Sequence, residues 1–396
     1  MGKYTFSREA YRSATLGFAP DKEPVTRRAE QESMRTGELN PLVDPKGFGV
    51  IRRSLPRLEK QNDGLWRLTV GTPVPIETRV DTTGSMGGNV DVAFRVLPRM
   101  YELCCEVLPG YDLQIATGIF GDVCDRFVLC RPQFEMTAEK IVEQLTLMVP
   151  ERLGGDTPED PQYGLFGAAY LTAAHINRLG LMGYDFTVSD APGRDRLDER
   201  QLKRIFGDDV FEKVTENGHR ITARDLPSTK EVVQDLLGRA HSFLVTGGKK
   251  QKATRNSVFG QAHAFFLQVG NDRETTHFWT NVFGADRVVV LPDTELLPQV
   301  QATIIGLTQG TLALDQVTEF LTRNNVSAAD AGKIVRSVAN IPIGAQAAMP
   351  NFSKRPQKGD LFREKTDEWP IDSKKNEVDE SADEPSDEEG GGVDWL

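Results

Sequence analysis

Three oxygen-bearing side chains stand at alternate positions where a predicted strand ends in the first quarter of the chain. Asp81, Thr83 and Ser85 belong to the run DTTGSM at positions 81–86, which continues into glycines. One carboxylate and two hydroxyls from one tight loop are hard oxygen donors, which Mg²⁺ or Mn²⁺ prefers and softer metals do not. The run therefore predicts a divalent-cation site at a strand end. Three glycines, Gly84, Gly87 and Gly88, allow the backbone to fold closely around the ion.

The same run resembles the first loop of the metal-ion-dependent adhesion site of von Willebrand factor A (VWA) domains, which reads Asp-x-Ser/Thr-x-Ser. The segment RLGGDTPED at 152–160 resembles the second loop and places its threonine at Thr157. The segment YDFTVSD at 184–190 resembles the strand that ends in the third-loop aspartate, Asp190. The resemblance covers roughly residues 74–308 and is to the intracellular bacterial or phage type. It implies a Rossmann-like VWA fold with a metal-dependent face that binds protein.

Coordination, rather than turnover, is the mechanism that the resemblance implies. The hydroxyls of Ser85 and Thr83 would touch the cation, and Thr157 would join them directly or through water. Asp81 and Asp190 would orient waters and balance charge. Because Mg²⁺ takes six oxygens, one position stays open for water or for an Asp or Glu of a partner protein.

Two further aspartates are weaker candidate ligands, Asp122 and Asp156. Asp122 stands in GDVCD at 121–125, which looks like a Gly-Asp-x-x-Asp loop of similar bacterial sequences, but Asp122 and Asp125 are equally well explained as turn formers. Purely structural roles are open for the other loops as well. Thr157 could cap a helix that begins with proline, and Asp190 could cap a helix or turn.

The elements that must position these residues alternate between strand and helix. Short apolar runs bounded by Gly, Asp or Pro predict buried parallel strands at 113–120, 186–189, 263–269 and 287–291. Apolar residues spaced three and four apart predict helices at 139–148, 164–174, 229–240 and 296–307, the third with a capping box from Ser228 to Glu231. The alternation predicts a mostly parallel sheet covered on both faces, with ligands at the carboxyl ends of its strands.

The strand that leads into Asp81 carries charges that a central strand should not. Glu77 and Arg79 share one face of the segment 74–80. Either they pair with each other beneath the N-terminal segment, or this strand is less central than the resemblance implies. The helix that follows contains Pro98 and should break into two pieces near Leu97.

Length and composition predict one large core with polar additions. The chain has 396 residues, of which 39% are hydrophobic. We expect an N-terminal arm at 1–70, a VWA domain at 71–310, a helical extension at 311–348 and a disordered acidic tail at 349–396. Within the extension, Asn324 and Asn325 should end one helix and Ser327 should cap a second. The extension is either part of the main core or a separate binding module.

The acidity of the chain comes from its tail. Residues 366–396 hold twelve acidic residues and two lysines, a net charge of −10 out of −11 for the whole chain. Their low apolar content predicts disorder, and the terminal 393–396 (VDWL) could dock into a partner. Net negative charge makes nucleic-acid binding an unfavoured function. A small basic cluster at Lys249, Lys250, Lys252 and Arg255 has solvation as its ordinary explanation.

Cytoplasmic localisation is the expectation for this sequence. It has no apolar run approaching the ~18 residues of a membrane helix, and its charged N-terminus lacks the apolar core of a signal peptide. Four cysteines form no Cys-x-x-Cys pair, and we expect reduced core residues. They are Cys104, Cys105, Cys124 and Cys130.

Three functions remain open from the sequence. The first is a divalent-metal-dependent adaptor or scaffold that captures a partner's Asp or Glu, as in systems with a AAA+ ATPase. The second is a metal-dependent hydrolase, which the five histidines do not favour because none has ligand spacing such as His-x-x-x-His. Ser85 also lacks the first glycine of a Gly-x-Ser-x-Gly nucleophile turn. The third is a structural component of a phage or other multiprotein particle.

Overall fold

The computed structural model describes most of the chain between residues 24 and 353. The described ranges are 24–47, 57–68, 72–154, 157–174, 176–177, 180–238, 242–245, 249–252, 261–348, 351–353 and 371–372. The tail residues 373–396, with the proposed docking end 393–396, lie outside them, as do Asp156, Arg255 and two histidines, His175 and His241.

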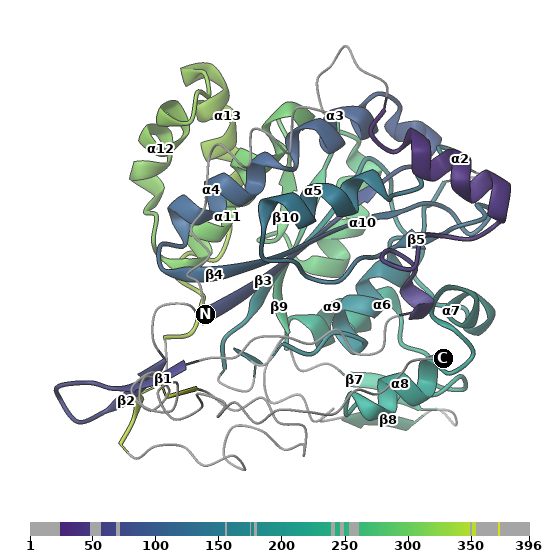
Figure 1. Cartoon of the computed structure of the whole chain (residues 1–396), viewed down its shortest axis with the longest axis horizontal. Helices are drawn as coiled ribbons and strands as arrows, with labels where there is room; N and C mark the ends of the chain where they lie inside the picture. The colour runs from purple at the N-terminus through teal and green to yellow at the C-terminus, as the bar shows by residue number, and fades with distance from the viewer. Residues whose placement is uncertain are drawn as a thin grey trace, which may run out of the picture.

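A six-stranded sheet forms the centre of the molecule (Figure 1). Its strand order is β10-β9-β6-β3-β4-β5, and only the short edge strand β5 runs antiparallel. The chain enters at β3, passes to β4 on one side and returns to β6 on the other, so the order reverses next to β3. The strands are β3 (Thr72–Asp81), β4 (Tyr111–Phe120), β5 (Leu129–Cys130), β6 (Gly183–Ser189), β9 (Ala262–Gln268) and β10 (Val288–Val290). The mostly parallel α/β architecture predicted from the sequence is confirmed.

One face of the sheet is covered by helices around its largest apolar core. Val74, Ile76 and Val80 of β3 lie in this core, because alternate side chains of a strand point to the same face. The covering helices are α3 (Asn89–Val96), α4 (Arg99–Val107), α5 (Ala138–Thr146), α11 (Leu297–Gln309), α12 (Val317–Arg323) and α13 (Ala328–Val338). The predicted break at Pro98 is confirmed, since α3 ends at Val96 and α4 begins at Arg99.

A second apolar core lies on the opposite face. Its centre is Trp279, which is fully buried and stacks on Phe266 of β9 with 4.4 Å between ring centroids. The helices of this face are α6 (Gln162–Tyr170), α7 (Glu199–Phe206), α8 (Val210–Glu216), α9 (Thr229–Leu236) and α10 (Arg273–Phe283). The predicted capping box of α9 is confirmed, because Ser228 and Glu231 exchange both hydrogen bonds.

The charged face of β3 is buried in the middle of this sheet. Arg79 is fully buried and pairs with Glu77 at 2.9 Å and with Asp185 of β6 at 2.5 Å. Arg131 donates two hydrogen bonds of 2.8 Å to the carboxylate of Glu77. The alternative of a less central strand is therefore wrong, because two cationic and two anionic side chains compensate one another inside the protein. Among the described elements α6 covers this face, since a Cβ added to Gly164 would lie 2.5 Å from Cδ of Arg79.

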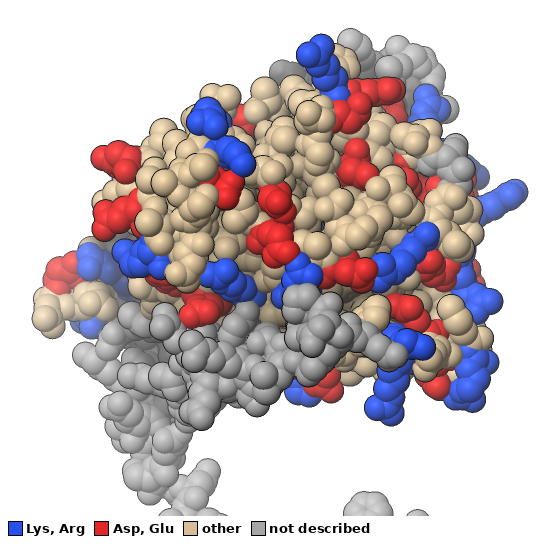
Figure 2. Space-filling view, turned by 90° about the horizontal axis from the view of Figure 1, so that it is seen from above, with Lys and Arg blue, Asp and Glu red and all other residues tan. Residues whose placement is uncertain are grey.

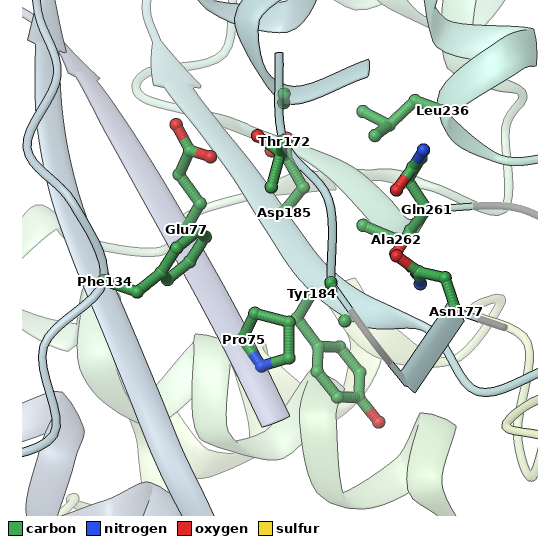
Figure 3. Close-up of a pocket in the computed structure, with 13 residues that line it drawn as sticks. Pro75, Glu77, Phe134, Thr172, Asn177, Tyr184, Asp185, Leu236, Gln261 and Ala262 are labelled. Carbon is green, nitrogen blue, oxygen red and sulfur yellow. Dashed lines mark hydrogen bonds between the residues drawn. The ribbon is translucent and has the colours of Figure 1, made fainter. Parts of the chain in front are cut away.

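The two acids of this group, Glu77 and Asp185, also line a small cavity. Glu77, Asp185 and Thr172 lie around it beneath α6, with Pro75 and Tyr184 at its other end (Figure 3). Its volume of about 20 Å³ is enough for a single water molecule. Although burial by itself raises the pKa of Glu77, the positive charges of Arg131 and Arg79 lower that pKa to about 2. Glu77 is therefore ionised at neutral pH.

The remaining elements surround this body. α2 (Arg27–Thr36) precedes Leu39 and Val43, which lie in the first core. Beyond the main sheet, a small four-stranded sheet has the order β11-β2-β1-β12, and β7 pairs with β8. The strands are β1 (Arg57–Lys60), β2 (Trp66–Leu68), β7 (Ser242–Val245), β8 (Lys249–Lys252), β11 (Asn351–Phe352) and β12 (Ile371–Asp372), and single 3₁₀ turns are η2 (Pro45–Gly47), η3 (Gly84–Met86), η5 (Thr294–Leu296) and η6 (Leu314–Gln316).

The predicted helical hairpin at 311–340 is present as α12 and α13. Asn325 has a positive φ of 65° after the end of α12, and Ser327 accepts a hydrogen bond from the backbone of Asp330 at 3.1 Å. Phe320 and Ile334 of the hairpin are buried in the first core together with the strands. This packing favours an extension of the core over a separate module. The boundaries predicted at 70, 310 and 348 remain predictions.

Candidate metal-ion site

The first loop begins where β3 ends in the middle of the sheet. Asp81 is fully buried, and its Oδ1 accepts hydrogen bonds from the backbone N–H of Thr83 at 2.8 Å and from the Thr83 hydroxyl at 2.7 Å. The hydroxyl oxygens of Thr83 and Ser85 lie 3.1 Å apart. The three side chains predicted to act together therefore converge, within the five residues from Asp81 to Ser85.

The third loop joins the first because β6 lies beside β3. Val80 pairs with Val188, which places Ser189 next to Asp81, and the Ser189 hydroxyl donates to Asp81 Oδ2 at 2.5 Å. One residue further on, Asp190 Oδ1 accepts a hydrogen bond of 2.9 Å from Ser85. Among the described helices none begins at Asp190, so its alternative role as a helix cap is not found. Sequence reasoning missed Ser189, whose only signal was its position directly before the predicted aspartate.

The second loop closes the site from the other side. The backbone N–H of Gly84 donates to the carbonyl of Leu153 at 2.6 Å, and a Cβ at Gly84 would make ordinary 3.5 Å contacts with the carbonyls of Arg152 and Leu153. Ser85 and Thr157 line one open depression of about 380 Å³. The other residues that line it are Gly84, Arg152, Leu153, Gly154 and Glu159. Thr157 is not a helix cap, since α6 begins only at Gln162.

The three glycines of the first loop differ in their roles. Gly87 has a positive φ of 50°, a conformation that L side chains rarely adopt, and Gly84 lies against the backbone of the second loop. A Cβ at Gly88 would meet nothing within 4 Å, so the expected need for glycine there is not found.

A buried carboxylate that the sequence reasoning did not single out completes the depression. Glu159 is only 4% exposed and lies beside the side chain of Thr83. Its Oε2 accepts no hydrogen bond from the described residues. Burial, together with the negative charges of Asp81 and Asp122, raises the pKa of Glu159 to about 8. In the sequence, Glu159 could have been noticed because it stands two residues after Thr157 and directly before another acid, Asp160.

Asp122 lies in a turn with Asp125, close enough for its charge to act on Glu159. Its backbone N–H donates to Asp125 Oδ2 at 2.9 Å, and the N–H of Cys124 donates to Asp122 Oδ1 at 3.4 Å. Arg194 lies 3.7 Å from Asp122 and 3.1 Å from Asp160. Asp122 and Asp125 therefore have the turn-forming role that was one of their two interpretations, in contact with an arginine.

The donors that converge here fit a divalent cation. Burial, with a contribution from the charge of Asp190, raises the pKa of Asp81 to about 6 despite its hydrogen bonds from Ser189 and Thr83. Asp81 and Glu159 thus lie in an environment short of positive charge, beside two hydroxyls. Hard oxygen donors of this kind suit Mg²⁺ or Mn²⁺. Among the described residues no group of three or more His, Cys, Asp or Glu side chains forms a metal cluster.

The histidines have other surroundings. His263 is 2% exposed and packs on Tyr184 with 5.5 Å between ring centroids. Burial, helped by the charge of Arg287, lowers the pKa of His263 to about 4, which keeps it neutral. His219 packs edge-on to Tyr170, and His277 lies near Asn281 on α10. The hydroxyl of Ser85 contacts Thr83 and Asp190, not one of these imidazoles.

The cysteines are free thiols, and the predicted core position holds for Cys104 and Cys130 but is wrong for Cys124, which is exposed. Cys104 and Cys130 are buried, Cys105 is partly buried and Cys124 is exposed. Burial raises the pKa of Cys105 to about 11 and of Cys130 to about 12. Thiols with such pKa values carry little thiolate and react slowly.

Charges of both signs are mixed on the described surface. On the face seen in Figure 2, the described Lys and Arg side chains are interspersed with Asp and Glu. Lys249, Lys250 and Lys252 lie on β8 of the small β7–β8 hairpin. In the described part of the chain, every helix is too short or too polar to cross a membrane.

Comparisons with known proteins give likenesses of fold only. No family model and no curated protein matches the chain. The pilus adhesin SpaC from Lactobacillus rhamnosus GG, in an open conformation, has 12% identity and a TM-score of 0.36 over 65% of this chain and 33% of its own. Proximal thread matrix protein 1 of the mussel byssus, with a zinc-occupied MIDAS motif, has 11% identity and a TM-score of 0.36 over 60% and 46%. A von Willebrand factor type A structure from Catenulispora acidiphila has 12% identity and a TM-score of 0.29 over 62% and 45%.

This chain therefore spans less than half the length of each of these three structures. Its own architecture carries more weight than likenesses at this level. The sheet places β3 at its centre with β4 and β6 on either side, and the three predicted loops meet at the carboxyl edge of β3 and β6. The chain has a Rossmann-like α/β fold, and its three loops lie where the resemblance to von Willebrand factor A domains implies.

Proposed function

We propose that this protein is a divalent-metal-dependent binding module that captures an acidic side chain of a partner protein. The observation that supports the proposal is the convergence of Asp81, Thr83, Ser85 and Asp190 through a continuous set of hydrogen bonds beside Thr157. Bound Mg²⁺ or Mn²⁺ would supply an electrophilic position for a carboxylate oxygen. The residues that would hold it are Asp81, Thr83, Ser85, Thr157 and Asp190.

The rim of the depression suits a protein ligand. Leu153 is 56% exposed at its edge, an apolar contact that a partner could cover. Arg152 lines the same depression and pairs with Asp91 at 2.6 Å. A cation, an arginine and an exposed leucine side by side favour a short acidic and apolar segment of a partner.

The cellular role is part of the same proposal. Free thiols that burial keeps protonated agree with a reducing compartment, which supports a cytoplasmic adaptor or scaffold. A AAA+ ATPase system is the kind of assembly in which such a module would work. Affinity capture of the full chain with and without Mg²⁺, followed by mass spectrometry, would identify the partner.

The test begins with the cation. Asp81→Ala removes one of the carboxylates that would hold the cation. It should abolish Mg²⁺ or Mn²⁺ binding measured by isothermal titration calorimetry. Divalent-dependent partner capture should be lost with it, while circular dichroism remains native. Asp208→Ala, which removes an exposed carboxylate before α8, is the matched control and should bind as the unaltered protein does. Undiminished partner capture in EDTA would show that the proposal is wrong.

A further inference from the structure

Two consecutive acids after the second loop have opposite surroundings. Asp160 is fully buried but well supplied with donors: the N–H of Val123 at 2.8 Å, the amide of Gln162 at 2.6 Å and Arg194 at 3.1 Å. Glu159 is 4% exposed, contacts the Thr83 side chain and has an Oε2 that accepts no hydrogen bond from the described residues. Asp160 is a structural acid, whereas Glu159 lacks a counter-group.

The backbone fixes Glu159 at the metal-ion site. Its N–H donates to the carbonyl of Pro192 at 2.9 Å, and its carbonyl accepts from the N–H of Arg194 at 3.1 Å. Glu159 is thereby paired with the segment that follows Asp190, and its carboxylate lines the same depression as Ser85 and Thr157. Its position does not depend on a bound partner.

The net charge of the cation-loaded site affects whether a partner's carboxylate can bind. Asp81 and Asp190 together neutralise a divalent cation. With Glu159 as a third carboxylate, the loaded site carries a net charge of −1, which repels an outside carboxylate until Glu159 moves away or is neutralised. A cation that takes six oxygens also has room for this third acid in the position that the other donors leave open.

We propose that Glu159 is a resident carboxylate ligand that occupies the open position of the cation, so that a partner's Asp or Glu binds by displacing it. This inference rests on the proposed function, because it requires a cation at Asp81, Thr83 and Ser85. It adds a regulatory property. Without a partner, Glu159 itself occupies the open position of the bound cation. Only a partner that makes further contacts, for instance with Leu153, can displace it.

The test uses Mn²⁺ as the probe, because its electron spin reports both occupancy and bound water. Mn²⁺ affinity is measured by electron paramagnetic resonance, and the number of exchangeable waters is measured by water-proton relaxation. Glu159→Gln, which is isosteric, should weaken Mn²⁺ binding about tenfold or more. It should also raise the relaxation of bound Mn²⁺, since water takes the vacated position. Glu216→Gln, on the exposed surface of α8, is the control for the loss of one charge and should change neither quantity.

Acetate serves as the model of a partner's side chain. Added to the Mn²⁺-loaded Glu159→Gln variant, acetate should lower the relaxation at concentrations that leave the unaltered protein unchanged. Glu159→Asp, whose carboxylate is one methylene shorter, should behave as Glu159→Gln does in the relaxation measurement. Thermal unfolding of each variant in EDTA establishes that it is folded.

The outcomes separate the two proposals. If Glu159→Gln leaves Mn²⁺ affinity, relaxation and the acetate response unchanged while Asp81→Ala loses the ion, the role of Glu159 is wrong and the proposed function stands. If Asp81→Ala binds Mn²⁺ as tightly as the unaltered protein, the proposed function itself is wrong. A Glu159→Gln variant that fails to fold would also overturn the inference, since a vacated ligand position should not be needed for folding without metal.

Discussion

Individual carboxylates at this site are buried without enough positive charge around them. Asp81 keeps hydrogen bonds from Thr83 and Ser189, yet burial still raises its pKa to about 6. Burial also raises the pKa of Glu159, to about 8, and the negative charges of Asp81 and Asp122 add to this increase. Residues that would be costly in an ordinary core are therefore concentrated where a cation would compensate them.

These shifts predict how stability depends on pH in the absence of metal. A carboxylate whose pKa is higher in the folded state binds more protons folded than unfolded, so the free energy of unfolding falls as pH rises through that interval. For Asp81 the interval runs from 3.8 to about 6, and its contribution is about 3 kcal/mol. For Glu159 the interval runs from 4.5 to about 8.

Urea unfolding in EDTA should therefore show lower stability at pH 8 than at pH 5. Saturating Mg²⁺ should restore stability most strongly at pH 8, because the cation binds the deprotonated acids. Asp81→Asn should flatten the pH dependence measured in EDTA. A metal-free protein whose stability rises over this range would contradict the assignment of these two carboxylates.

At the scale of elements, α6 packs closely on β3 because it has a glycine at the point of contact. Arg79 is held between Glu77 and Asp185, so its aliphatic stem cannot move away from α6. Gly164 of α6 faces that stem, and a Cβ there would lie 2.5 Å from Cδ and 2.8 Å from Nε of Arg79. A helix of larger residues could not cover the charged face of this strand.

Gly164→Ala should accordingly destabilise the protein by about 2 kcal/mol, the usual cost of overpacking a well-filled interior. Gly332→Ala is the matched control, because its Cβ would make only an ordinary 3.7 Å contact within α13. That change should be neutral or stabilising by about 0.5–1 kcal/mol. Equal effects of the two substitutions on the urea midpoint would refute the tight packing of α6 on Arg79.

At the scale of the whole molecule, the C-terminal hairpin shares its core with the sheet. Phe320 and Leu321 of α12 and Ile334 and Val338 of α13 are buried among the same apolar residues as the strands. Gly306 of α11 lies close to Leu312 and Val107, and a Cβ there would come within 3.0 Å of the former and 3.3 Å of the latter. One cooperative body is therefore expected from β3 through α13.

Phe320→Ala tests that expectation and should cost about 3–5 kcal/mol through the cavity it leaves. Unfolding is followed by the fluorescence of Trp279 in the opposite core, in a background in which Trp66, Trp369 and Trp395 are replaced by Phe. It should shift together with unfolding followed by circular dichroism. Thr318→Ala, an exposed position on the same helix, should shift neither curve appreciably. A fluorescence transition that is unchanged in Phe320→Ala would instead make the hairpin a separate module.

The sequence by itself determined the features that arise between near neighbours in the chain. Asp81, Thr83 and Ser85 are two residues apart, so their spacing alone predicts that they meet, and the capping box of α9 spans only three residues. Strand and helix alternation likewise predicted the parallel sheet, because each element has its own apolar periodicity.

Only the tertiary structure decided which distant residues complete the site. Ser85 meets Asp190 across 105 positions and Asp81 meets Ser189 across 108, and both contacts follow from the register of β3 against β6. Glu159 reaches the site because its backbone pairs with the segment after Asp190. The spacing of neighbouring residues predicts neither strand register nor loop pairing, since both depend on how separate elements pack together.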